Sequence, residues 1–200
     1  MKQGRKISIV SRMFAVLLAV MMVCSNISIP SKAAETVQTI AAWEYKDKDS
    51  APSSLPAGAT SGSGQLNVTG ATYTGYSSKS LAANNWEEEG SWTISEINAE
   101  KYENLTFSAS LRSSNTGAKN FQLEYSLDKG QSWMVVAGGA VEITSTNLTQ
   151  LYKDVKLPAE LSGKNFTLRV KKVGTTSVNG GTVALTGASN INHIVIKGTT

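Results

Sequence analysis

The stretch Ser126-Leu127-Asp128-Lys129-Gly130-Gln131-Ser132-Trp133 stands between two runs in which apolar and polar residues alternate. Residues 120–125 before it place single polar residues between apolar ones, which is the period of a half-buried strand. After it, Trp133 and Val135 resume the alternation. Within it, an aspartate can accept hydrogen bonds from turn N–H groups, and a glycine can adopt a positive φ. The stretch therefore predicts a β-hairpin with a capped tip, whose structural turn residues are Ser126, Asp128, Gly130 and Trp133.

The spacing S-x-D-x-G-x-S-W resembles the Asp-box, a turn motif of sialidase propellers and many other secreted β-proteins. Those proteins use the box as a structural turn away from their catalytic centres, so the resemblance implies a hairpin and no activity. Sialidase chemistry is disfavoured by composition, because recognition of a sialic acid carboxylate requires clustered arginines. After residue 33 only Arg112 and Arg169 remain.

Residues 1–33 are predicted to be a secretory signal peptide. Four basic residues precede an apolar run at residues 13–23, which is shorter than the roughly 20 residues needed to cross a bilayer. Ser31-Lys32-Ala33 then supplies small residues for cleavage after Ala33 or Ala34. A lipoprotein is the lesser alternative, because the residue before Cys24 is a valine where a lipobox requires a small residue. The expected mature protein is secreted and free of the membrane.

Removal of this segment changes the charge and the cysteine content of the chain. It takes away five of the nineteen Lys and Arg residues and none of the fifteen Asp and Glu residues, which leaves 14 basic against 15 acidic side chains. The pI of about 9.1 belongs to the full chain, so it does not support nucleic-acid binding by the mature domain. The only cysteine also leaves, and an exported chain without disulfides favours a bacterium of Gram-positive type as the source.

Residues 34–200 are predicted to form one all-β domain, an antiparallel β-sandwich. Short alternating runs separated by Gly, Ser, Asn and Thr recur along them, and no long stripe with a period of 3.6 is present. Residues 65–69 and 71–76 are expected to pair through a turn at Gly70. The other expected strands cover residues 37–45, 105–112, 140–144, 150–157, 166–171 and 192–197, with a further strand starting at Trp92.

The order of residues is also similar to the jelly-roll modules, of the galactose-binding-like and carbohydrate-binding-module-like kind, in secreted bacterial proteins. The similarity rests on the runs Tyr102-Glu103-Asn104-Leu105-Thr106-Phe107-Ser108, Arg112-Ser113-Ser114-Asn115-Thr116-Gly117 and Ser189-Asn190-Ile191-Asn192-His193-Ile194-Val195-Ile196. It implies a jelly roll that often carries a structural Ca²⁺ ion and lies beside catalytic domains or in surface proteins. Those modules more often have Asp where Asn192 and His193 stand, which weakens the case for a metal site at the end of this chain.

Few side chains have the pattern of a catalytic or metal site. His193 is the only histidine, and alternation places it in or beside a packed strand, so we interpret it as structural. Glu44, Asp47 and Asp49 are weak calcium candidates as oxygen donors, since the EF-hand pattern is incomplete. We expect no other metal and no cofactor.

The loop at residues 82–90 is the expected ligand-binding region. Trp86 is expected to be exposed there and to stack on a sugar ring, while Asn85 and Glu87 hydrogen-bond its hydroxyls. Trp92 and Tyr73 are expected to belong to the core. Glu87 and Glu89 offer a pair of carboxylates for glycoside hydrolysis, although neighbouring glutamates usually form a solvated loop.

The sequence thus predicts a secreted, non-catalytic binding or accessory module for a neutral glycan or cell-surface polysaccharide. One alternative is the N-terminal accessory domain of a secreted nuclease or phosphoesterase whose catalytic part is absent. A less favoured alternative is a small glycoside hydrolase that uses Glu87 and Glu89. The domain is expected to be a monomer that binds no nucleic acid.

Overall fold

The computed structural model describes residues 35–200, which form two antiparallel sheets and one short 3-10 helix, η2 (Ala159–Leu161). The predicted signal peptide and its cleavage site lie outside the described residues. Within residues 35–200 no helix is long and apolar enough to cross a membrane.

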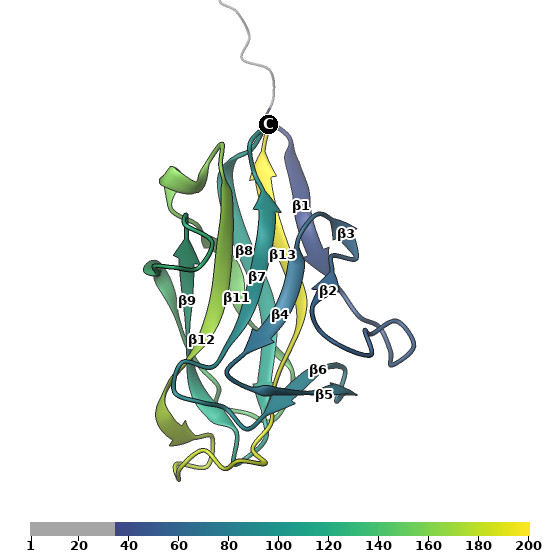
Figure 1. The fold of residues 1–200 in the computed structure, drawn as a ribbon, viewed down its shortest axis with the longest axis vertical. Coiled ribbons are helices and arrows are strands. Elements are labelled where there is room, and N and C mark those ends of the chain that lie inside the picture. The colour runs from purple at the N-terminus through teal and green to yellow at the C-terminus, as the bar shows by residue number, and fades with distance from the viewer. Residues whose placement is uncertain (1–34) are drawn as a thin grey trace, which may run out of the picture. The chain divides into compact units, whose positions relative to one another are not determined.

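Sheet A has seven strands in the described part of the chain, and its main path runs in the order β11-β8-β13-β1-β3. Two further strands extend it, because β6 pairs with β13 and β5 pairs with β6 (Figure 1). The bounds of these strands are β1 (Val37–Trp43), β3 (Ser61–Gly62), β5 (Thr72–Ser77), β6 (Ser80–Asn84), β8 (Glu103–Ser113), β11 (Thr149–Lys156) and β13 (Ser189–Thr199).

Sheet B has six strands among the described residues, in the order β10-β9-β12-β7-β4-β2. Their bounds are β2 (Ala57–Gly58), β4 (Gln65–Thr69), β7 (Ser91–Asn98), β9 (Ala118–Ser126), β10 (Met134–Glu142) and β12 (Asn165–Ser177). The chain passes from β7 in sheet B to β8 in sheet A, back to β9 and β10, and then through β11 and β12 to β13. These repeated crossings between two antiparallel sheets make the fold a β-sandwich of jelly-roll type, as predicted.

The core lies between the two sheets, where the apolar members of each alternating run meet. In β8 the apolar residues Leu105, Phe107, Ala109 and Leu111 are buried in the core, and the polar residues between them lie on the opposite face of the sheet, where Ser108 and Ser110 are also covered. Phe107 packs edge-on against Tyr152 of β11, with ring centroids 5.4 Å apart. Trp92 of β7 is also fully buried, which confirms the expectation that it belongs to the core.

The predicted pairing of residues 65–69 with residues 71–76 is wrong, because the two strands belong to different sheets. β4 pairs with β7, where Leu66 lies opposite Ile94. β5 pairs with β6, where Tyr73 lies opposite Ala83. Residues 80–84, Ser-Leu-Ala-Ala-Asn, were expected to be partly loop, yet four of them are buried in a strand. A strand buried on both faces carries no alternation, so this partner of β5 gave no periodic signal.

The predicted hairpin is present between β9 and β10, with Tyr125 opposite Met134. The Ser126 hydroxyl accepts the N–H of Gly130 at 2.7 Å and donates to Asp128 Oδ1 at 2.7 Å. Asp128 Oδ1 also accepts the N–H of Ser132 at 2.9 Å, and Oδ2 accepts its hydroxyl at 2.5 Å. These bonds close the tip from inside, so the direction in which the chain leaves the turn is fixed.

We expect Asp128 to make the stability of the fold depend on acid. Hydrogen bonds from Ser126 and Ser132 hold the pKa of its carboxyl well below the usual value. Its ionisation therefore stabilises the folded state above about pH 4, and this contribution is lost as the pH falls through and below that value. Urea denaturation of the wild type and Asp128→Asn should show a stability gap at pH 7 that narrows by pH 3. An equal gap at both pH values would contradict the capping role.

Candidate functional site

The outer face of sheet B is crossed by a row of polar side chains from four adjacent strands. The register places Asn67 of β4 opposite Thr93 of β7, and Thr93 opposite Arg169 of β12. Arg169 in turn lies opposite Glu124 of β9. Their apolar neighbours in each strand point into the core, so these four side chains share the opposite face.

Neighbouring positions extend this face in both directions along the strands. A second row follows the same strands through Thr69, Ser91, Lys171 and Gln122. On the other side of the first row, Gln65 lies opposite Ser95. The side chains of Gln65 and Ser95 make no hydrogen bond to any residue within 35–200, and both are half-buried. We call the set Gln65, Asn67, Thr69, Thr93, Ser95, Arg169 and Lys171 the polar face.

Arg169 is the fixed centre of the polar face. Its guanidinium bonds the Glu124 carboxylate through two nitrogens, each 2.6 Å from Oε2, and the two side chains are only 12% and 11% exposed. The guanidinium carbon lies 4.4 Å from the centroid of the Trp133 ring, a cation–π contact. Trp133 is held by the hairpin, since a Cβ at Gly130 would come within 3.2 Å of its ring. The hairpin thus places an aromatic ring beside the polar rows.

Glu89 closes the edge of this face from the loop before β7. Its carboxylate lies 2.6 Å from Lys171 Nζ and 3.4 Å from the Arg169 guanidinium. The hydrogen bond from Lys171 holds the pKa of Glu89 below its usual value. The two cations of the face are therefore matched by the carboxylates of Glu89 and Glu124.

The lowered pKa of Glu89 also bears on the hydrolase alternative. The general acid of a glycosidase needs a raised pKa, so that it keeps a proton to give to the leaving group. Glu89 has the opposite environment, and its oxygens already contact Lys171 and Arg169. Glu89 is therefore poorly suited to be the general acid of a glycosidase.

The expectation that Trp86 is exposed is wrong. Its side chain is only 8% exposed, and its ring packs edge-on against Trp92 at 5.8 Å and Phe121 at 5.9 Å. The indole N–H donates to the carbonyl of Ala83 at 2.9 Å. Strand β6 extends to Asn84, so Trp86 follows a buried strand closely and turns its ring back into the core. The polar residues next to Trp86 in the sequence suggested that its ring is exposed, but the preceding strand β6 directs the ring into the core.

The two other candidates of that loop do point to solvent. Asn85 is exposed with a φ of 51°, and its N–H donates to the carbonyl of Leu185 at 2.7 Å. Glu87 is exposed, and its N–H donates to the carbonyl of Gly70 at 2.8 Å. Trp86, Asn85 and Glu87 therefore do not form one ligand-binding surface, because the Trp86 ring that was expected to stack on the sugar is buried. Tyr73, expected in the core, is half-buried against it and donates to the carbonyl of Pro52 at 2.7 Å.

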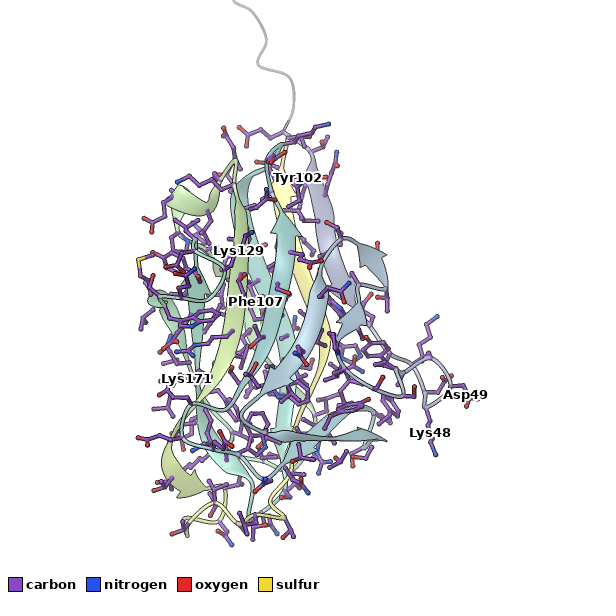
Figure 2. The ribbon with its side chains drawn as sticks, in the orientation of Figure 1. Lys48, Asp49, Tyr102, Phe107, Lys129 and Lys171 are labelled. Carbon is purple, nitrogen blue, oxygen red and sulfur yellow. The ribbon has the colours of Figure 1, made fainter. Side chains whose placement is uncertain are left out.

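The calcium candidates do not assemble into a site. Glu44, Asp47 and Asp49 are exposed, and Asp49 lies at the tip of the loop that projects after β1 (Figure 2). Asp47 Oδ1 accepts the N–H of Ser50 at 2.8 Å, and hydrogen bonds from Ser50 lower the pKa of Asp47. Residues 35–200 contain no group of three His, Cys, Asp or Glu side chains placed to hold a metal ion.

His193 lies beside the packed face of β13 and not within it. A bulge interrupts the pairing of β13 with β8 between Asn192 and Val195, and His193 there has a φ of 48°. The bulge lets Ile191 and Ile194 both enter the core while His193 stays exposed, with Nδ1 3.2 Å from the hydroxyl of Ser110. Simple alternation could not reveal this change of face.

The set built around Arg169 was not identified from the sequence. The alternation of Thr167, Arg169 and Lys171 with buried residues shows that they share a face. The missing information was the register, which brings Glu124 and Trp133 to Arg169 from positions more than 30 residues earlier in the chain.

Neither a known protein family nor a curated protein matches the sequence of this chain. Among solved structures it is similar to a family 29 carbohydrate-binding module from Piromyces equi, with 10% identity, a TM-score of 0.46, and coverage of 83% of this chain and 92% of that one. A second module of that family has 12% identity, a TM-score of 0.46 and coverage of 83% and 89%. A variant in complex with cellulohexaose has 13% identity, a TM-score of 0.46 and coverage of 84% and 94%. At TM-scores below 0.5 these likenesses assign no ligand to this chain.

We expect Trp86→Ala to act on stability, because its ring belongs to the core. Removing a buried aromatic side chain of this kind costs about 3–5 kcal/mol of unfolding free energy. Trp86→Phe, which keeps an aromatic ring in the space, should cost clearly less. Chemical denaturation followed by fluorescence or circular dichroism measures both variants. A Trp86→Ala protein as stable as the wild type would contradict the buried position.

Proposed function

We propose that the chain is a secreted, non-catalytic module that binds a neutral glycan on the polar face of sheet B. The observation that carries the proposal is the face itself, where amide and hydroxyl groups of β4 and β7 stand in rows that continue to Arg169 of β12, whose guanidinium packs on Trp133. The mature chain is proposed to act outside the cell on the strength of the signal-peptide pattern in residues 1–33.

The polar face offers the groups that sugar hydroxyls require. Gln65 and Asn67 carry amides, and Thr69, Thr93 and Ser95 carry hydroxyls, so donors and acceptors alternate over a short distance. Strand backbones hold these side chains in rows at the spacing of adjacent strands, about 4.8 Å. Because the strand backbones are fixed before a ligand arrives, only the rotamers of the side chains remain to be ordered when it binds.

The charges of the face favour a neutral ligand. Arg169 and Lys171 are already paired with Glu124 and Glu89, so neither cation is free to attract a polyanion. An acidic polymer would also approach the exposed carboxylate of Glu87 in the neighbouring loop. A neutral saccharide meets no such repulsion, and the part of the half-buried Trp133 ring that Arg169 leaves uncovered gives it an apolar surface.

The first test is retardation in native gels that contain a soluble β-glucan, a mannan, a xylan or polygalacturonate. We expect at least one neutral polysaccharide to retard the wild type and polygalacturonate to leave it unaffected. Gln65→Ala combined with Asn67→Ala should weaken binding about tenfold, as the loss of two hydrogen bonds implies.

The matched control is Thr106→Ala combined with Gln150→Ala, because both side chains lie on the outer face of sheet A. This control should bind as the wild type does. Failure of every neutral polysaccharide to bind would overturn the proposal. So would loss of binding in the control pair while the Gln65 and Asn67 pair binds normally.

A further inference from the structure

A hollow of about 390 Å³ lies beyond the end of the polar face, between sheet A and the end of β7. Its walls come from β1, from Gly62 and Ser63 around β3, and from the turn that joins β7 to β8. Tyr102, which lines it, lies at the same end of the sandwich as the C-terminus (Figures 1 and 2). Neither the strand pattern nor the candidate loop pointed to this place.

We propose that this hollow holds one sugar residue of the glycan, with the sugar ring against Tyr102. The inference rests on the proposed function and adds a second contact for the same ligand. With this contact the module recognises one defined unit of the glycan, an end or a branch, in addition to the sugars that lie along the polar face.

Tyr102 has a fixed backbone and a half-buried side chain, whose hydroxyl donates to Gln38 Oε1 at 3.5 Å. Its N–H donates to the carbonyl of Ala99 at 2.9 Å, and its carbonyl accepts the N–H of Gly163 at 3.1 Å. A Cβ at Gly198 of β13 would come within 2.9 Å of the Tyr102 Cβ, so that strand backs the residue closely. The backbone and Cβ of Tyr102 are therefore fixed before a ligand binds, so only the side-chain rotamer remains to be ordered.

Polar groups for the sugar hydroxyls surround this ring. Asn98 uses its Oδ1 to accept the N–H of Glu100 at 3.0 Å, which leaves its NH₂ group to donate to a ligand. The hydroxyls of Thr39 and Ser63 also line the hollow, and neither bonds any residue of the described chain. The buried Ile40 adds an apolar wall. An aromatic ring with hydroxyl and amide groups around it suits a sugar, which has both apolar ring faces and polar edges.

The charges at the hollow again favour a neutral ligand. Glu100 and Lys101 are adjacent and opposite in sign, and Glu100 Oε1 accepts the side-chain N–H of Asn165 at 3.1 Å. No single-sign field therefore forms at the mouth. This matches the balance of charges on the polar face.

The hollow and the polar face are connected through two strands. Ser63 comes two residues before Gln65 of β4, and Asn98 comes three residues after Ser95 of β7. At no more than about 3.4 Å per residue, and with a bulge at Glu96 on the way, Asn98 lies within roughly 10 Å of Ser95. A glycan chain that lies along the face can therefore extend its next unit into the hollow.

The test fills the hollow without touching the face. Ser63→Tyr places a bulky ring in it, and Ser54→Tyr is the matched control, an exposed serine of the same segment that does not line it. Calorimetry with short and long oligosaccharides of the β-glucan, the mannan and the xylan compares the variants. We expect Ser63→Tyr to bind the long oligosaccharides about fivefold to tenfold more weakly, and Ser54→Tyr to bind them as the wild type does.

Tyr102→Ala is a second variant, and its far-ultraviolet circular dichroism must match that of the wild type before its affinity is compared. Wild-type affinity in Ser63→Tyr, with weakened binding in the Gln65 and Asn67 pair, would leave the proposed function standing and overturn the hollow.

If no oligosaccharide binds at all, the proposed function fails, and amide NMR decides the hollow separately. Glucose, mannose and xylose are then titrated into the wild type. Shifts confined to Ser63, Asn98 and Tyr102 would support the hollow, and no shift at these amides would overturn it.

Discussion

Burial of Leu168 and Val170 between the two sheets forces the intervening Arg169 onto the outer face of sheet B. Two consecutive residues of a regular strand cannot both point into the core, because successive side chains point to opposite faces. The same constraint acts in β4 and β7, where burial of Leu66 and Ile94 turns Asn67 and Thr93 outward. The polar face is thus the outer face of the strands whose inner face forms the core. The spacing of its side chains is set by the hydrogen-bonded register of these strands.

The cation at the centre of that face needs its own stabilisation. An arginine with little exposure has lost much of its hydration, and that loss is costly unless a carboxylate and further hydrogen-bond partners replace the water. Glu124 supplies the close pair at 2.6 Å, and Trp133 covers the guanidinium at 4.4 Å. Trp133 depends on the turn that Asp128 and Ser126 close. The hairpin tip at residues 126–133 therefore contributes to the site through its last residue, Trp133.

The fold was predictable where residues alternate and was not predictable where they do not. β8 and β12 follow from alternation, and the hairpin follows from its turn chemistry, since both signals are local. β6 escaped because a strand buried on both faces reads as a plain apolar run, and its partner β5 was then paired wrongly. The exposure of His193 depends on a bulge, and the burial of Trp86 depends on β6. The pairing of β5, the exposure of His193 and the burial of Trp86 all depend on strand pairing between distant residues, which a local sequence pattern does not reveal.

The candidate site follows the same division. Which side chains share a face could be predicted strand by strand, but which of them meet is a matter of register. Arg169 meets Glu124 and Glu89 across separations of 45 and 80 residues. The hollow at Tyr102 depends on more still, because its lining comes from β1, from residues around β3 and from the β7–β8 turn. Taken together, the contacts describe a surface that is rigid, balanced in charge and shallow. Such a surface gains little from charge or from deep burial, so under the proposed function we expect a small affinity for one sugar and stronger binding when several units are engaged at once. A hollow at the end of a polar face supplies that arrangement, since each further unit of a glycan adds a contact without a second loss of translational freedom.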